Sequence, residues 1–412
     1  MSDKTAGWRH YLTIGACYWG FTLSDGAVRM LVLFYFFQLG YTPFQLASLF
    51  VFYELAGMFA NLIGGWLATR FGLRAMLAAG VGLQIVGLLS LSVLQPGWTP
   101  VLSVVWVVLA QGLCGVAKDL TKTASKAAIK IVGVSSNQQM FSWVAWFTGS
   151  KNAVKGIGFF VGGLGMAVAG FAPSLWTLAV LLAGVLLAII TTLPAGLGQM
   201  PASKTVAELF SKSSAVNLLA AARVFLFGAR DIWFVVGIPV YFYETGWPFW
   251  QVGSFLAVWT VFYGVIQGFA PRFIRRSDDG LSAEIPAARI TILLCAMVPL
   301  VLGLWAMLGT AEGAGVPLMP VSGVVAGLFV FAVLFALNSS LHSYLILAYA
   351  GSKKVAEDVG FYYAANAAGR LAGTLLSGLC YGAFGLAGCL LASFVFLFIC
   401  TGLCWRLPAR AS

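Results

Sequence analysis

Nine charged side chains lie inside apolar runs that are long enough to cross a membrane, and they are the residues of this sequence best placed to do chemistry. An ionisable side chain at bilayer depth costs about 2.5 to 3.5 kcal/mol on insertion scales, so each one needs a partner or a use. The acids are Asp25, Glu54 and Asp231, and the cations are Arg29, Lys151, Lys155, Arg223, Arg230 and Arg370. The excess of cations favours an anionic ligand.

The segment TGSKNAVKG, residues 148–156, carries two of these cations four residues apart. Lys151 and Lys155 share one helical face, and like charges at this spacing destabilise a helix unless water, an acid from another helix or an anionic ligand is near. Lys151 can instead extend to the membrane surface. For Lys155 and Arg370, the alternative to ligand binding is a structural salt bridge with one of the three acids.

The buried acids have two possible uses. Asp25 and Arg29 are four residues apart and can form an intrahelical pair. Arg230 and Asp231 are adjacent, so their side chains point about 100° apart and we expect each to find a partner on another helix. A carboxylate in a partly dehydrated cavity is easier to protonate than in water, so Asp25, Asp231 or Glu54 can exchange a proton for substrate. Alternatively, Arg29 and Arg230 hold these acids permanently ionised.

A second set of cations supports the same sign of ligand. One cationic face repeats every four residues and comprises Lys118, Lys122, Lys126 and Lys130. It is either an ordinary basic segment near a cytoplasmic loop or a surface that attracts anions to a cavity mouth. We expect Arg223 to play a similar part in the other half of the chain. An arginine can hold a phosphate or carboxylate through two parallel hydrogen bonds, whereas a lysine acts as a mobile point charge.

Three uncharged residues near these runs are also candidates. Asn152 and Asn366 lie close in sequence to the buried cations and can orient hydroxyl groups of a ligand. His342 is either a proton site or a polar residue packed between helices. The seven cysteines lie mostly within apolar runs without metal-ligand spacing, so we interpret them as small packing residues. We expect no metal site and no cofactor.

The composition is that of a polytopic helical membrane protein. Of 412 residues, 60% are hydrophobic and 9% are charged, against roughly 25% charged residues in an ordinary soluble domain. Apolar runs of about 20 residues can each cross the ~30 Å hydrocarbon core as a helix. We place twelve spans near residues 11–39, 45–68, 75–95, 99–117, 140–171, 174–194, 217–243, 249–270, 287–309, 318–345, 359–384 and 386–405.

Lysine and arginine alternate across the predicted connections. They gather in the segments on the side of the N-terminus, while the opposite loops carry acids such as Glu244 and Glu312. By the positive-inside rule, both termini lie in the cytoplasm. The net charge of +11 follows largely from this topology, so it needs no nucleic-acid partner.

An internal repeat predicts two pseudo-symmetric six-helix halves. A shift of 206 residues superposes Asp25 on Asp231 and Gly40 on Gly246, and a shift of 215 superposes Lys155 on Arg370 and Gly170 on Gly385. The predicted parts are one half over 1–194, a cytoplasmic linker over 195–216 and a second half over 217–412. Equivalent positions of such halves face each other across a central cavity, so Lys155 and Arg370 are predicted to clamp a ligand with an anionic group at each end.

Several classes of enzyme are disfavoured by missing motifs. There is no Walker motif and no H-E-x-x-H helix, and the serines lack a nearby histidine base. Histidine occurs only at His10 and His342, which argues against a zinc site. A membrane enzyme or sensor is therefore the less favoured alternative, and a channel is difficult to reconcile with two alternating halves.

The loop between the second and third spans reads GWLATRFGLR, residues 65–74. It resembles the G-x-L-a-D-R-x-G-R-R/K signature of the major facilitator superfamily, whose glycines allow a tight cytoplasmic turn and whose cations cap helix ends. Thr69 stands where the signature has aspartate, which puts the charge-relay role of this loop in doubt. The resemblance implies a twelve-helix transporter fold.

Five longer blocks carry a narrower resemblance that covers most of the chain. They are YWGFTLSDGAVRMLVL (18–33), GVAKDLTKTASKAA (115–128), TGSKNAVKGIGFF (148–160), AARVFLFGARDIWFVV (221–236) and NAAGRLAGTLLSG (366–378). These blocks contain almost all of the buried charges, and they are similar to organoarsenical efflux permeases of the ArsJ type.

This resemblance implies a bacterial inner-membrane exporter of 1-arseno-3-phosphoglycerate. That compound forms when glyceraldehyde-3-phosphate dehydrogenase uses arsenate in place of phosphate, so the dehydrogenase is the implied functional partner and arsenate resistance the implied outcome. We expect a proton gradient to drive the export. The residues by themselves predict a cavity for a multiply charged organic anion, and an organophosphate/phosphate exchanger or a drug/proton antiporter of the same fold stays open.

Overall fold

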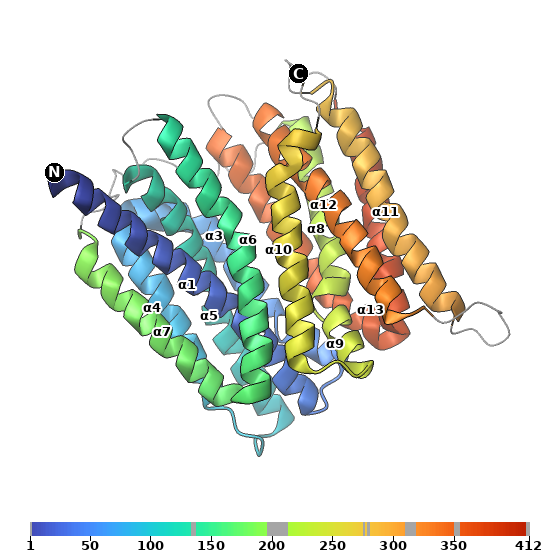
Figure 1. Ribbon diagram of the computed structural model, residues 1–412, viewed down its shortest axis with the longest axis horizontal. Helices are drawn as coiled ribbons and strands as arrows, with labels where there is room; N and C mark the ends of the chain where they lie inside the picture. Colours follow the sequence, from blue (N-terminus) through green and yellow to red (C-terminus); the bar gives the residue numbers. More distant parts are fainter. Residues whose placement is uncertain are drawn as a thin grey trace. The chain divides into compact units, whose positions relative to one another are not determined.

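The computed structural model describes residues 2–132, 137–195, 213–274, 277, 281–309, 319–349 and 355–408, with side chains described except at 2–8, 61–70, 126–132, 137–149, 271, 347 and 355–360. These ranges contain helices and connections and no strand (Figure 1). The helices are α1 (Ser2–Gln38), α2 (Pro43–Ser48), α3 (Val51–Phe71), α4 (Leu73–Ser92), α5 (Pro100–Val132), α6 (Asn137–Val168), α7 (Phe171–Thr192), α8 (Ser214–Phe234), α9 (Gly237–Glu244), α10 (Phe249–Phe273), α11 (Glu284–Gly309), α12 (Val321–Tyr349) and α13 (Val355–Trp405).

Within the described residues, 10 segments are long and apolar enough to cross a membrane. The last of these, Phe361–Trp405, is broken where Phe384 and Gly385 leave the helical conformation, so it contains two helices. Helix α6 occupies the place of the fifth predicted span. Each of the twelve predicted spans therefore corresponds to a helical segment, and the predicted all-helical, polytopic membrane architecture is confirmed.

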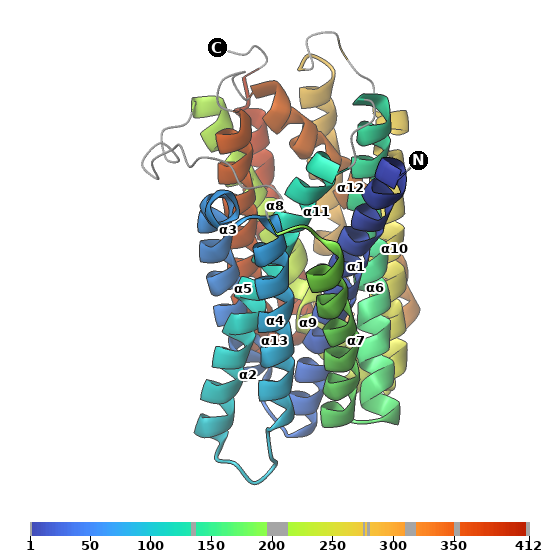
Figure 2. The same cartoon turned by 90° about the vertical axis from the view of Figure 1, so that its left-hand side faces the viewer.

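The first compact unit, here the first unit, is formed by α1, α3 to α7 and the first half of α10. Helix α1 packs on α6 and α7, α3 packs on α5, and Figure 2 shows α4 beside α5 and α7. Stacked aromatic rings hold α1 in place. Tyr35 stacks on Phe171 of α7 at 4.1 Å between ring centroids, and Phe34 stacks on Phe249 of α10 at 4.5 Å. The apolar side chains that the spans require are thus used to join helices as well as to face lipid.

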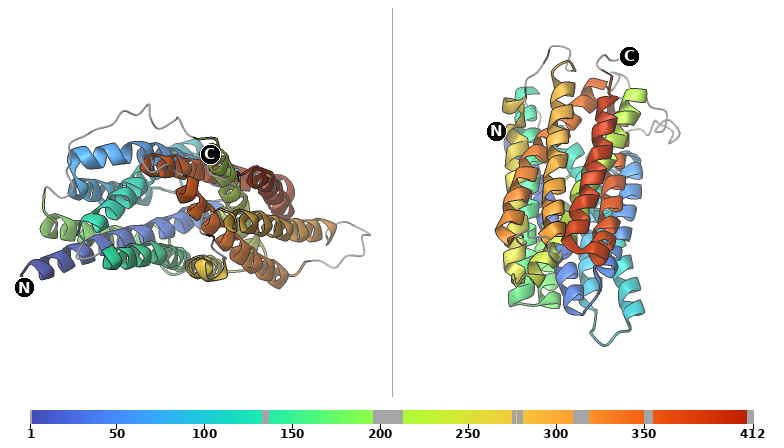
Figure 3. Two further views of the ribbon diagram at one scale, coloured as in Figure 1. Left: turned by 90° about the horizontal axis from the view of Figure 1, so that it is seen from above. Right: turned by 90° about the vertical axis from the view of Figure 1, so that its right-hand side faces the viewer.

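The second unit is formed by α2, α8, α9, α11, α12, α13 and the second half of α10. Helix α13 packs along α8, α11 and α2, and the right-hand view of Figure 3 shows α11 beside α13. Trp233, which is fully buried, meets Phe331 of α12 edge to face at 5.2 Å. The predicted half boundaries stay a prediction, because α2 groups with the second unit and most of the predicted linker lies outside the described residues.

Glycines that the repeat pairs with each other all have positive φ angles. The φ angles are 81° at Gly40 and 92° at Gly246, and 82° at Gly170 and 59° at Gly385. Positive φ is strained for residues that carry a Cβ, so each of these turns depends on glycine. The internal repeat found in the sequence is thus visible in the turns that separate successive helices.

The loop with the superfamily signature contains the predicted tight turn. Gly72 has a φ of 82° and directly precedes α4. Arg74 donates from Nη2 to the carbonyl oxygen of Ile190 at 2.6 Å, near the C-terminal end of α7. A cation at this end offsets the negative pole of the helix. The expectation that a basic residue of this loop caps a helix is therefore confirmed for Arg74, whereas the side chain of Thr69 lies outside the described residues.

Candidate functional site

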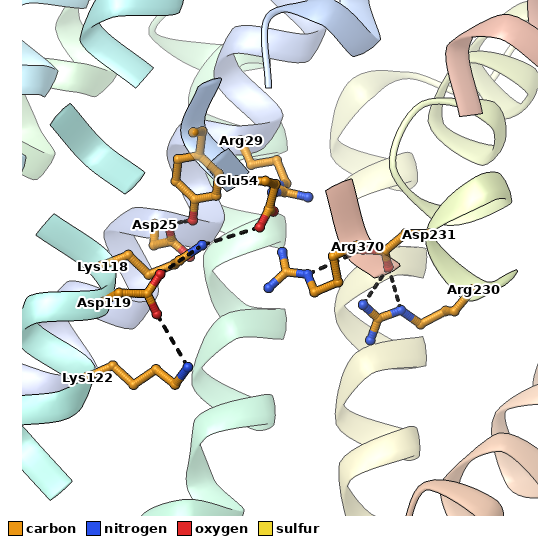
Figure 4. Close-up of polar contacts among 10 residues, drawn as sticks. Asp25, Arg29, Glu54, Lys118, Asp119, Lys122, Arg230, Asp231 and Arg370 are labelled. Atoms are coloured by element: carbon orange, nitrogen blue, oxygen red, sulfur yellow. Dashed lines mark hydrogen bonds and ion pairs between the residues drawn. The ribbon is translucent and has the colours of Figure 1, made fainter. Parts of the chain in front are cut away.

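A buried ion network joins three helices of the first unit (Figure 4). Arg29 on α1 donates from Nη2 to Oε1 of Glu54 on α3 at 2.7 Å, and the Lys118 ammonium on α5 lies 3.5 Å from the other carboxylate oxygen of Glu54. The Glu54 side chain is only 1% exposed. Each carboxylate oxygen of Glu54 therefore faces a cation. Losing either cation would leave a buried charge poorly compensated.

Asp119 extends this network along α5, although the sequence did not single it out. Its Oδ2 lies 3.7 Å from the Lys118 ammonium and its Oδ1 lies 3.3 Å from the ammonium of Lys122. The inner part of the predicted cationic face is therefore neutralised by Asp119 and Glu54. The side chains of Lys126 and Lys130 lie outside the described residues.

Asp25 differs from the other buried acids in its partner. The hydroxyl of Tyr53 on α3 donates a hydrogen bond to Oδ1 of Asp25 (Figure 4). The intrahelical pair with Arg29 that the spacing allowed does not form, since Arg29 points to Glu54 instead. A neutral donor can bond a carboxylate and can also bond a protonated carboxyl group, because a carboxylic acid keeps acceptor capacity after it takes up a proton.

Asp231 in the second unit lies between two arginines. Arg230 donates to Oδ1 from Nε at 2.7 Å and also from Nη2, while Arg370 on α13 donates to Oδ2 from Nε at 3.3 Å (Figure 4). The expectation that the adjacent residues Arg230 and Asp231 do not pair is wrong. Their Cβ atoms diverge, but the long arginine side chain bends back along the helix surface and brings its planar group side-on to the carboxylate. The structural salt bridge considered for Arg370 is present.

Arg223 is the most deeply buried of the arginines around Asp231. Its residue is 4% exposed, its Nη1 donates to the carbonyl and hydroxyl oxygens of Ser339 at 3.2 Å, and its guanidinium lies 4.0 Å from the centre of the Phe227 ring. Arg230 lies 5.0 Å from the centre of the same ring, which joins the two arginines. In the described part of the chain, Nε of Arg223 has no hydrogen-bond partner and Arg223 forms no ion pair.

Glycine allows the helices in both units to approach closely enough for these contacts. A Cβ at Gly115 on α5 would collide with the carbonyl oxygen of Tyr53 on α3. A Cβ at Gly373 on α13 would lie 2.5 Å from the carbonyl oxygen of Gly228 and 2.8 Å from Cβ of Asp231 on α8. Contacts this short are not tolerated, so each ion cluster depends on a small residue one or two turns from the charges.

The remaining candidates from the sequence lie on α6 and α13. Lys151, Asn152 and Lys155 are half-buried on α6, and the Lys155 ammonium lies 5.7 Å from the centre of the Phe159 ring one turn along. Asn366 lies one turn before Arg370, and its Oδ1 is buried without a hydrogen-bond partner among the described residues. Lys155 belongs to the first unit and Arg370 to the second, and the predicted clamp between them stays a prediction.

His342 is fully buried between α12 and α13. Its Nε2 lies 3.3 Å from Sγ of Cys404, and Cys400 lies one helical turn before Cys404. A position between helices was one of the two sequence-based interpretations of His342, but its neighbour is a thiol rather than an acid. This proximity cannot be predicted from sequence spacing, because His342 is about sixty residues from either cysteine.

The two charge clusters have different net charges. The cluster in the first unit contains three cations, Arg29, Lys118 and Lys122, which pair with Glu54 and Asp119, and a third acid, Asp25, which is bonded to Tyr53. Among the described residues, the cluster in the second unit contains three arginines, Arg223, Arg230 and Arg370, and one acid, Asp231. Of the two clusters, the one in the second unit therefore carries the excess of positive charge.

Comparison with known proteins identifies the fold. No protein-family model matches the sequence. No curated protein matches it either. Among solved structures, a POT family transporter in complex with a thioalcohol-conjugated peptide is similar at a TM-score of 0.71 and 15% identity, covering 95% of this chain and 94% of that one.

Two further solved structures are similar over nearly the full length. A POT family transporter in complex with 5-aminolevulinic acid has a TM-score of 0.73 at 14% identity and covers 96% of this chain and 95% of that one. The peptide transporter POT in complex with sulfate has a TM-score of 0.74 at 15% identity and covers 98% and 96%. POT family transporters belong to the major facilitator superfamily, so this chain has the major facilitator fold.

Proposed function

We propose that this protein is an alternating-access membrane exporter of a multiply charged organic oxyanion, with 1-arseno-3-phosphoglycerate as its substrate. The observation that carries the proposal is the excess of arginine over acid around Asp231. Asp231 compensates one of the three positive charges, and a dianionic phosphate or arsenate group would compensate the other two. Buried cations are stable when such a partner is bound.

The chemistry of arginine suits this ligand. A guanidinium carries several N–H donors in one plane, so it can hold a carboxylate on one edge and a phosphate-like group on another. Arg370 contacts Asp231 through Nε, which is the side edge of the group. One solved neighbour is in complex with sulfate, a tetrahedral dianion of the same shape as phosphate and arsenate groups. Asn366, one turn from Arg370, would bind a hydroxyl group on the same ligand.

The other end of the substrate is assigned to α6 of the first unit. Lys155 is the repeat equivalent of Arg370, and Lys151 and Asn152 lie on the turn before it. The substrate has a phosphate at one end and an arsenate ester at the other, so a cation from each half matches its charge distribution. Lys118 and Lys122, which are paired with acids, contribute to the general attraction of anions and not to direct binding.

Proton coupling is assigned to Asp25. Glu54 and Asp231 each have cations at both carboxylate oxygens, whereas the partner of Asp25 is the neutral Tyr53 hydroxyl. Asp25 can therefore take up a proton without leaving a buried cation unpaired. Movement of that proton down its gradient would drive the anion outwards. His342, bonded to a thiol, is not required by this scheme.

The same proposal includes the location of the protein and the source of its substrate. The chain lies in the bacterial inner membrane with both termini in the cytoplasm, as the distribution of lysine and arginine predicts. Glyceraldehyde-3-phosphate dehydrogenase supplies the substrate in the cytoplasm and is a functional partner without a physical contact. Export of the unstable ester would remove arsenate from the cell.

Transport into everted membrane vesicles tests the proposal. Vesicles are supplied with glyceraldehyde 3-phosphate, arsenate, NAD and the dehydrogenase, and accumulated arsenic is measured with and without a proton gradient. We expect accumulation that requires the dehydrogenase and the gradient. Lys155→Gln and Arg370→Gln should abolish it. Arg406→Gln removes the same charge from an exposed arginine after α13 and should transport normally.

The outcomes separate the proposal from its alternatives. Normal accumulation in both Lys155→Gln and Arg370→Gln would show that these cations do not bind the substrate. Counterflow of phosphate against an organophosphate, without a requirement for arsenate, would identify an organophosphate exchanger. Transport of lipophilic cations would identify a drug antiporter, a result that the arginine-rich cluster argues against.

A further inference from the structure

Three possible metal ligands lie close together in the second unit, and none of them belongs to the charge clusters. His342 on α12 and Cys400 and Cys404 on α13 are all fully buried, and their candidate ligand atoms lie within 4.8 Å of one another. Sγ of Cys404 lies 3.3 Å from Nε2 of His342. In a tetrahedral zinc site, with Zn–S of about 2.3 Å and Zn–N of about 2.0 Å, ligand atoms stand roughly 3.5 to 3.8 Å apart. The three atoms are thus close to the spacing that such an ion requires.

The geometry points to a binding site for a thiophilic d¹⁰ metal ion of the Zn²⁺ class at His342, Cys400 and Cys404, and we propose such a site. The donor set is one imidazole nitrogen and two sulfurs, which borderline and soft ions prefer over Mg²⁺ or Ca²⁺. The scarcity of histidine argued against a zinc site in the sequence, but two thiols supply the ligands that further histidines would otherwise provide.

Charge balance supports an ion of this class. A divalent ion with two thiolates and a neutral imidazole has no net charge, so it can be buried without the cost of an unpaired ion. Without metal, the Cys404 thiol can bond Nε2 of His342, and the Cys400 thiol donates to the carbonyl oxygen of Ala222 on α8 at 3.2 Å. Metal binding replaces both thiol protons, which are released to solvent.

The place of the site in the fold gives it a structural effect. Cys400 and Cys404 share one face of α13, one turn apart, close to where this helix ends at Trp405. Arg289 on α11 donates to the carbonyl oxygens of Cys404 and Leu407. These bonds join the C-terminal end of α13 to α11. An ion bound to His342 would add a bond from α13 to α12.

Cobalt binding to the purified full-length protein tests the proposal. The protein is prepared in detergent without a histidine tag, reduced, stripped with a chelator and titrated with Co²⁺. We expect one ion per chain, a thiolate-to-Co²⁺ charge-transfer band, intense visible bands typical of tetrahedral coordination, and loss of all bands on addition of Zn²⁺. The Cys400→Ser and Cys404→Ser variants should lose the charge-transfer band in part, and the double variant should lose it entirely.

Two controls make the result decisive. Cys17→Ser changes a thiol that is equally buried in the first unit and should bind Co²⁺ like the unaltered protein. His342→Gln should weaken binding by at least roughly 10- to 100-fold, the loss typical of changes around a metal centre. The proposal is overturned if the reduced, unaltered protein gives no thiolate band. It is also overturned if the double cysteine variant, eluting as a single species in gel filtration, binds Co²⁺ as the unaltered protein does.

Discussion

Asp25 and Asp231 occupy equivalent positions in the internal repeat but have different surroundings. Asp25 accepts a hydrogen bond from the neutral Tyr53 hydroxyl, whereas Asp231 is held at both carboxylate oxygens by Arg230 and Arg370. Neutralising Asp231 would leave two guanidinium groups without their carboxylate, whereas neutralising Asp25 would leave no cation unpaired. The repeat has therefore kept the position of an acid while its partners diverged.

The same contrast extends to the clusters around these acids. The cluster in the first unit is balanced, with three acids for three cations, and that in the second unit has one acid for three arginines. A balanced network stabilises the fold and can take up a proton, whereas an arginine excess is suited to an anion. We therefore expect substitutions in the cluster of the first unit to change stability and coupling, and those in the cluster of the second unit to change affinity for the substrate.

The largest effect is expected for Glu54→Gln. This change leaves the buried Arg29 and Lys118 without their shared carboxylate, and breaking a buried pair costs about 3 to 5 kcal/mol. The free energy of unfolding in detergent, followed by the helical circular dichroism signal, should fall by that amount. Glu244→Gln is the matched control, since Glu244 is exposed and accepts a hydrogen bond from the Tyr381 hydroxyl. Equal losses in the two variants would contradict a structural role for the buried network.

A smaller effect is expected for Arg223→Gln, and it should be an effect on substrate affinity rather than on stability. Arg223 pairs with no acid in the described residues, so its loss leaves no buried charge behind and the fold should be kept. A charged hydrogen bond to the substrate contributes roughly 1.5 to 3 kcal/mol, so the apparent KM in vesicle transport should rise about 10- to 100-fold. Lys122→Gln, which removes a cation paired with Asp119, should change KM little. Comparable increases in both variants would break the proposed division between the clusters.

The sequence predicted the fold and the positions of the buried charges, but not most of their partners. Apolar runs and basic loops are local signals, and they were enough for the spans and for the turn at Gly72. The Lys118–Glu54 pair depends on the close contact of α3 and α5 at Gly115, and the Arg230–Asp231 pair depends on how a long side chain bends. Neither is encoded in residue spacing, whereas the Asp119–Lys122 pair has the i,i+3 spacing of a helix. The proximity of His342 to Cys404 is likewise a product of tertiary packing.

The contrast between the two equivalent acids predicts a difference in coupling. Asp25→Asn keeps an oxygen that can accept from Tyr53 but cannot exchange a proton, so the protein should still carry substrate down its gradient. It should no longer accumulate substrate in response to a proton gradient. Such a gradient supplies about 1.4 kcal/mol per pH unit for each coupled proton. Asp231→Asn should keep that response. Gradient-driven accumulation in Asp25→Asn at the level of the unaltered protein would exclude Asp25 as the proton carrier.

The smallest expected effect tests the same hydrogen bond directly. Tyr53→Phe removes the donor to Asp25 but keeps the ring beneath the Lys118 ammonium, 4.1 Å from its centre, so it should cost about 1 kcal/mol of stability. Tyr362→Phe is the control in the second unit, since the buried Tyr362 hydroxyl lies beside the neutral Ser343 hydroxyl rather than a carboxylate, and its loss should cost less.

A double-mutant cycle of Tyr53→Phe and Asp25→Asn can then distinguish an ionised from a protonated Asp25. Hydrogen bonds to a charged group contribute roughly twice as much as those between neutral groups. If Asp25 exchanges a proton, the coupling energy between the two positions should be larger at high pH, where the carboxylate is ionised, than at low pH, where it is protonated. A coupling energy that does not change with pH would mean that Asp25 keeps one protonation state. Proton coupling would then have to involve a group other than Asp25.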